Sequence, residues 1–114
     1  MENLNHRKEN IMTGIFIGGF HSLGVTKPDG EDREIPYDNL VLLFQKPFEP
    51  LNMPTCVREH GVGFMTVEAK CPWSRLTDVF KGADITCVED LEGYVGVELD
   101  YYFNDKKKLD KVYL

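Results

Sequence analysis

Residues 94–103 alternate between two kinds of side chain with unusual regularity, and this alternation constrains the fold more than any other feature. Apolar residues occupy positions 95, 97, 99, 101 and 103, while Glu98 and Asp100 fall on the opposite parity. A period of two is that of a β-strand with one buried face. Residues 104–107 have turn composition and residues 109–114 supply a returning strand, so the end of the chain predicts a β-hairpin.

Three earlier segments also predict strands. Residues 11–20 alternate with β-branched and aromatic side chains, and Gly14, Gly18 and Gly19 indicate strong curvature or a bulge. Residues 27–33 have the Pro and Asp-Gly chemistry of an exposed loop, which leads into a second strand over residues 34–46. Residues 62–70 predict a third strand ending at Cys71 and Pro72. Between the second and third strands, three prolines predict a connector without regular structure.

Residues 73–82 predict a helix of about two turns, because Trp73, Leu76, Val79 and Phe80 share one face. Ser74 is the expected N-cap and Gly82 the expected stop. The whole pattern predicts a mainly β fold: a five-stranded, antiparallel barrel like the oligonucleotide-binding (OB) fold, with a short helix between strand three and the closing hairpin. An open β-sandwich is the alternative. Residues 1–10 are expected to form a flexible arm and residues 11–114 a single barrel domain.

Several function classes lack their usual sequence signals. The three cysteines at 56, 71 and 87 form no C-x-x-C pair, and no catalytic or phosphate-binding motif occurs. We therefore expect no enzyme activity, no metal and no cofactor. No apolar run reaches the ~20 residues that a membrane helix needs. Residues 1–10 are polar, so we expect no secretory signal. We expect a cytoplasmic protein without membrane contact.

The order and spacing of these elements resemble those of the single-stranded-DNA-binding proteins of filamentous phages and their relatives on Gram-positive plasmids and integrated elements. The similar pieces are residues 14–20, 37–42, 67–80 and 94–99, within a resemblance that spans about residues 11–114. The resemblance implies a barrel protein that dimerises and coats single strands during replication or transfer of a phage or mobile element. It implies no sequence preference and assigns no binding residue.

Candidate binding residues follow from the chemistry that a single strand requires. Bases stack on exposed aromatic rings, and phosphates attract cations. The candidate aromatic residues are Tyr37 and Tyr102, which strand parity places opposite the apolar face, and Phe20, which lies where the first strand leaves the barrel. The candidate cations flank the predicted loops and strand ends: Lys27, Arg33, Lys46, Lys106, Lys107 and Lys108. The expected partner is single-stranded DNA, with RNA as the other possibility.

The net charge of −6 opposes binding to a phosphate backbone unless the cations are segregated. Residues 101–114 are the net-basic part of the chain, with four basic and two acidic side chains. The alternative function is an acidic protein-interaction module or inhibitor, which would use a sheet edge or a surface that mimics DNA. A homodimer is also expected, because a small barrel cannot easily bury all of Ile11, Ile15, Ile17, Val41 and Leu43.

Overall fold

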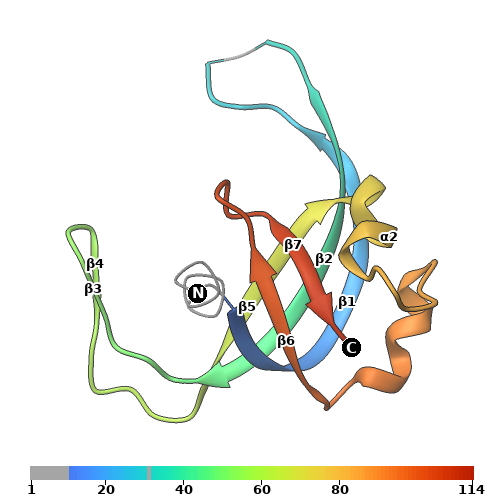
Figure 1. Ribbon diagram of the computed structural model, residues 1–114. Helices are drawn as coiled ribbons and strands as arrows, with labels where there is room; N and C mark the ends of the chain where they lie inside the picture. Colours follow the sequence, from blue (N-terminus) through green and yellow to red (C-terminus); the bar gives the residue numbers. More distant parts are fainter. Residues whose placement is uncertain (1–10, 31) are drawn as a thin grey trace.

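The computed structural model describes residues 11–30 and 32–114, and a curled five-stranded antiparallel sheet forms its body (Figure 1). The order of neighbouring strands is β5-β2-β1-β6-β7. Their bounds are β1 Ile11–Thr26, β2 Ile35–Pro47, β5 Phe64–Pro72, β6 Glu98–Phe103 and β7 Leu109–Tyr113. Because β6 returns to lie beside β1, the strands β6-β1-β2-β5 form a Greek key. The predicted mainly β fold with five antiparallel strands is confirmed.

The sheet is not closed into the predicted barrel. Its two outermost strands, β5 and β7, are not paired with each other in the hydrogen-bonded order. The curl still brings some of their Cα atoms within 8 Å of one another. Closure fails although these edges approach, so the sheet retains two edges that a closed barrel would remove.

Strand β1 bends where the sequence predicts it. Its register against β2 shifts between Phe16 and Gly18, which is the position of a β-bulge. Gly14 lies against the packed interior: a Cβ there would stand 3.1 Å from Phe44 Cβ and 3.2 Å from the Gln45 carbonyl oxygen. The glycine thus lets two strands pack closely at the bend.

The core fills the concave side of the sheet. Phe44 and Tyr101 are fully buried, and their rings stack with centroids 4.0 Å apart and an interplanar angle of 13°. The ring of Phe16 packs against that of Phe44, with centroids 5.8 Å apart. Even-numbered residues of β2 face this core, so the odd-numbered residues of β2 face outward.

Short helical segments cover one end of the core. They are η1 Trp73–Arg75, α2 Leu76–Val79 and η2 Val88–Tyr94. The expected helix is therefore shorter and partly 3-10, and no side chain caps it, so the assignment of Ser74 as N-cap is wrong. Gly82 does have the left-handed backbone of a stop, with φ of 92°.

The predicted start of the closing hairpin is also wrong. Tyr94 belongs to η2, and β6 begins only at Glu98. Gly96, with φ of 90°, turns the chain between them. Val95 and Val97 consequently remain exposed although their parity matches that of the buried Leu99.

Two hairpins project from the body (Figure 1). The first is the outer half of β1 and β2, which continues the sheet well past the predicted end of the first strand. The second pairs β3 Leu51–Met53 with β4 Cys56–Arg58, where the prolines predict no regular structure. That prediction is wrong because Pro54 lies in the hairpin turn, where its fixed φ is compatible with the chain reversal.

An aromatic contact joins the first hairpin to the helical segments. The His21 imidazole lies parallel to the Trp73 indole, with centroids 3.7 Å apart, and contacts the Asp38 carboxylate across the strand pair. The expected arm at residues 1–10 lies outside the described residues. Within the described part of the chain, no helix is long and apolar enough to cross a membrane.

Candidate nucleic-acid interface

A groove of about 370 Å³ runs over the outward face of β1, β2 and β5. It brings together two of the aromatic residues that the sequence selects, Phe20 and Tyr37. These residues are 46% and 39% exposed, so both are accessible at the surface. The other lining residues are Ser22, Thr26, Asn39, Val41, Glu68 and Lys70.

Cross-strand pairing explains why these residues meet. The register is continuous from Gly18 to Thr26, and it sets Phe20 opposite Val41 and Gly24 opposite Tyr37. Val41 in turn pairs with Lys70 of β5. Val41 is buried on this outward face and forms the floor of the groove.

The ring of Tyr37 lies across Gly24. A Cβ at Gly24 would stand 2.8 Å from the Tyr37 hydroxyl oxygen and 3.0 Å from its Cζ atom. The ring thus occupies the space that a side chain would take, in the way that aromatic residues cover glycine in sheets. One part of the ring rests on the strand while the rest faces solvent, which is the geometry of a stacking platform.

Lys70 is the cation within the groove. Its side chain is about half exposed, and its Nζ lies 3.9 Å from Glu68 Oε1. A phosphate placed beside Phe20 would meet the ammonium group of Lys70 and the opposing charge of Glu68. The groove itself is therefore nearly neutral, so stacking is its stronger means of binding a nucleic acid.

Further cations lie in the two loops that the sequence predicts. Lys27 and Arg33 belong to the β1–β2 loop, which begins directly after the groove residue Thr26. The lysines at 106, 107 and 108 form the β6–β7 turn, and all three are exposed. In Figure 1 this turn and the β1–β2 loop both point toward the upper end of the molecule.

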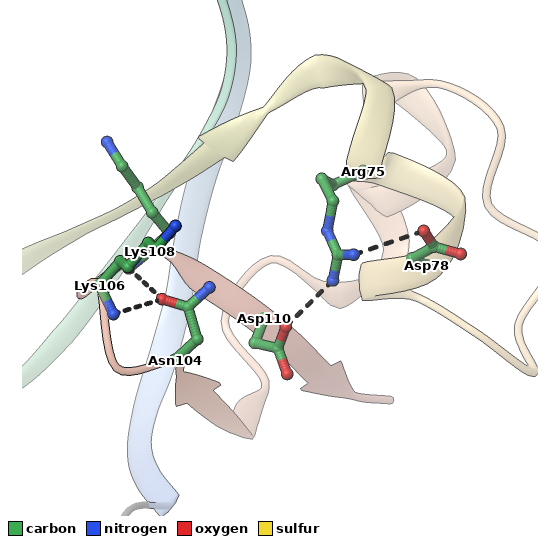
Figure 2. Close-up of polar contacts among 6 residues, drawn as sticks. All are labelled: Arg75, Asp78, Asn104, Lys106, Lys108 and Asp110. Carbon is green, nitrogen blue, oxygen red and sulfur yellow. Dashed lines mark hydrogen bonds and ion pairs between the residues drawn. The ribbon is translucent and has the colours of Figure 1, made fainter.

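Hydrogen bonds fix the shape of the β6–β7 turn, as Figure 2 shows. The backbone amides of Lys106 and Lys108 donate to Asn104 Oδ1 at 2.9 and 3.1 Å. Lys107 has a φ of 60°, as a tight turn requires. In the same view, Arg75 binds Asp110 at 3.0 Å and so joins η1 to the neighbouring strand β7. Hydrogen bonds therefore hold the backbone of the turn that carries the three lysines.

Phe20 and Tyr37 line the groove and the other seven predicted residues do not; two of those seven, Lys46 and Tyr102, have surroundings of their own. Lys46 is near the far end of β2, on the parity opposite Tyr37, and its Nζ binds Glu49 Oε2 at 3.2 Å. Tyr102 lines a separate hollow of about 220 Å³ together with Ile11, Asp110, Lys111 and Tyr113. The structure thus gathers Phe20 and Tyr37 at one place and does not bring Lys46 or Tyr102 to it.

Sequence reasoning missed Lys70, Ser22 and Asn39. Lys70 shares its parity with Thr66 and Glu68, and this polar alternation is a signal that could have found it. Ser22 and Asn39 could be found only by knowing that β1 continues to Thr26 and pairs with β2 in this register.

Cys71 is a buried packing residue. Cys71, on the core side of β5, is 1% exposed, and burial raises the pKa of its thiol to about 11. The nearby Arg75 guanidinium opposes that rise without cancelling it. A thiol with so high a pKa is a packing group and a poor nucleophile.

Comparison with protein families, with curated proteins and with solved structures finds no match for this chain.

The contact between Gly24 and Tyr37 makes a testable prediction. Gly24→Ala should push the Tyr37 ring off the strand and weaken binding to single-stranded DNA by about three- to tenfold, part of the worth of one stacked base. Gly18→Ala is the matched control, because nothing lies within 4 Å of a Cβ at that position. Fluorescence anisotropy with labelled oligo-dT measures both. Equal affinities for the two variants would show that the ring position does not matter.

The charges in the groove make a second prediction. Lys70→Ala should lower the slope of log affinity against log salt by about 0.7, the value of one phosphate contact on a single strand. Glu68→Gln should instead tighten binding by about two- to fivefold at low salt, as removal of an exposed like charge would. Salt titrations of the two variants check this. An unchanged slope for Lys70→Ala would place the phosphates elsewhere.

Proposed function

We propose that the protein binds single-stranded DNA without sequence preference, on the outward face of β1, β2 and β5. The observation that carries the proposal is the groove in which Phe20 and the supported ring of Tyr37 are exposed beside Lys70. Each base stacked on an aromatic side chain contributes ~1–3 kcal/mol to affinity, whatever its identity. Two such platforms favour a binder that tolerates any sequence.

The topology supports the same proposal. An OB fold is a five-stranded, partly open Greek-key barrel that binds oligonucleotides on its second and third strands and on the loops 1–2 and 4–5. The corresponding strands here are β2 and β5. The corresponding loops hold Lys27 and Arg33 on one side and the three lysines of the β6–β7 turn on the other. We propose that the sheet is an open member of this fold class.

The biological setting is proposed from the resemblance to phage and mobile-element proteins. A protein of this kind would coat single strands exposed during replication or transfer. RNA offers the same bases and phosphates, so the binding experiment needs both oligo-dT and oligo-U. Tighter binding to oligo-dT is the outcome that the proposal expects.

A salt titration with labelled oligo-dT tests the proposed function. Affinity should fall as salt rises, because bound cations on the nucleic acid are released when lysines replace them. Changing Lys106, Lys107 and Lys108 together to Ala should weaken binding and leave the fold intact, since all three side chains are exposed. No binding at low salt would reject the proposal.

The alternative is an acidic module that binds another protein. The net charge of −6 and the unpaired outer edges of β5 and β7 favour it. Phe64, near the start of β5, is 61% exposed and would suit an added strand. Absence of oligo-dT binding at low salt would favour this function over the first.

We also propose that the protein forms a homodimer. Val41 is buried in the single chain, but Ile17 remains exposed and Ile11, Ile15 and Leu43 are only half-buried. A second copy would cover part of this apolar surface. Light scattering should therefore give twice the chain mass of 13.1 kDa, and a monomeric mass at working concentration would contradict the proposal.

A further inference from the structure

Three successive cross-strand pairs form the rungs of the groove. The first is Phe20 with Val41, the second Ser22 with Asn39, and the third Gly24 with Tyr37. Each rung is two residues from the next along both strands. At the ~3.4 Å rise of an antiparallel strand, consecutive rungs lie about 7 Å apart.

Only the outer two rungs carry an aromatic ring. Phe20 and Tyr37 are therefore separated by two rung spacings, too far for adjacent bases of a stacked strand, which rise ~3.4 Å per nucleotide. A strand extended to about twice that rise would place one nucleotide on each rung. Bases unstacked in this way are the ones that aromatic side chains receive.

The middle rung is polar. Ser22 and Asn39 are half-buried groove residues, and within residues 11–30 and 32–114 neither side chain makes a hydrogen bond. The Ser hydroxyl and the Asn amide each both donate and accept. They can therefore form hydrogen bonds with the edge of any base placed between Phe20 and Tyr37.

We propose that the groove is a three-nucleotide site in which Phe20 stacks the first base, Ser22 and Asn39 hydrogen-bond the edge of the second, and Tyr37 stacks the third. This inference rests on the proposed function and specifies its ligand: an extended trinucleotide segment of single-stranded DNA. Lys70, which pairs with Val41 on the first rung, contacts the phosphate at that end. Strand polarity does not enter the proposal.

The experiment is a set of NMR titrations of the ¹⁵N-labelled full chain with short oligonucleotides, which report weak binding. The ligands are d(TT), d(TTT), d(TTT) with an abasic middle position, and d(TTT) with an abasic end. The test variant is Ser22→Ala with Asn39→Ala. The matched control is Thr66→Ala with Gln45→Ala, a hydroxyl and amide pair that face each other across β5 and β2 outside the groove.

The wild type should bind d(TTT) about tenfold more tightly than d(TT), because the shorter ligand loses one stacked base. Removing the middle base should weaken wild-type binding by about three- to tenfold, as lost hydrogen bonds would. In the variant with Ser22→Ala and Asn39→Ala, removing the middle base should cause no further loss of affinity. Removing an end base should still weaken its binding about tenfold. The control variant should behave as wild type.

Two results would overturn the three-nucleotide site while leaving the proposed function in place. One is equal affinity for d(TT) and d(TTT), and the other is an equal loss from the abasic middle position in wild type and variant. Failure of long oligo-dT to bind would instead remove the proposed function and this site together. If the double variant does not fold, Asn39→Ala alone takes its place in the comparison.

Discussion

Tyr37→Ala and Phe20→Ala are each expected to weaken binding to oligo-dT by about tenfold or more, and their combination by about a hundredfold. Each substitution removes one stacking platform, and a stacked base is worth ~1–3 kcal/mol. The double variant should show nearly additive losses, because the two rings lie two rungs apart and do not contact each other. Fluorescence anisotropy at fixed salt measures the three affinities.

Two control variants accompany this prediction. Tyr37→Phe retains the ring and should bind within about twofold of wild type if stacking dominates. Tyr102→Ala removes a tyrosine from the separate hollow and should leave affinity unchanged, because Tyr102 does not line the groove. A larger loss from Tyr102→Ala than from Tyr37→Ala would move the interface to the other hollow.

Phe44→Ala is expected to destabilise the fold by about 3–5 kcal/mol, the usual cost of emptying a buried aromatic site. Phe44 is fully buried, stacks on Tyr101 and packs against Phe16. A loss of this size is a large part of the ~5–15 kcal/mol by which domains are stable. Urea unfolding, followed through the single tryptophan Trp73, gives the change in free energy.

Tyr101→Phe is the matched control for the core. The Tyr101 hydroxyl is buried and has no hydrogen-bond partner among the described residues, and burial raises its pKa. Removing that oxygen keeps the ring stack with Phe44 and eliminates a buried polar atom without a hydrogen-bond partner. The variant should therefore be as stable as wild type or up to ~1–3 kcal/mol more stable. Destabilisation by Tyr101→Phe would show that the hydroxyl is satisfied in solution.

The sequence predicted the sheet because its strands keep one face in the core. Alternation located the first part of β1 and most of β6, while turn chemistry and β-favouring residues located β2, β5 and β7. The glycines near Phe16 predicted the bulge in β1. The sequence could not predict the β3–β4 hairpin, where Pro54 indicates a break but occupies a turn. The predicted strand began too early because the alternation from Tyr94 continues through Gly96, where a left-handed backbone turns the chain before β6 begins at Glu98.

The site was predicted in part for the same reason. Parity selected Tyr37, and its place at the end of the first predicted strand selected Phe20; the structure places both in one groove. Phe20 shares its parity with the buried Phe16 and faces outward because the register shifts between Phe16 and Gly18. The spacing of Phe20 and Tyr37 depends on the β1–β2 register, which fixes which residues share a rung. Lys46 is separated from the groove by its place near the far end of β2 and by its parity, which is opposite that of Tyr37. Tyr102 is separated because β6 pairs with the other edge of β1, a long-range property that no local pattern contains.

The most direct test of the binding face is a titration of ¹⁵N-labelled protein with a dT oligonucleotide long enough to cover the groove, at low salt. The largest amide shifts are expected in residues 20–26 and 37–41 and at Glu68 to Lys70, which surround the groove. Shifts should be small around Lys46 and Tyr102. Absence of any shift, or shifts confined to the hollow around Tyr102, would contradict the proposed interface.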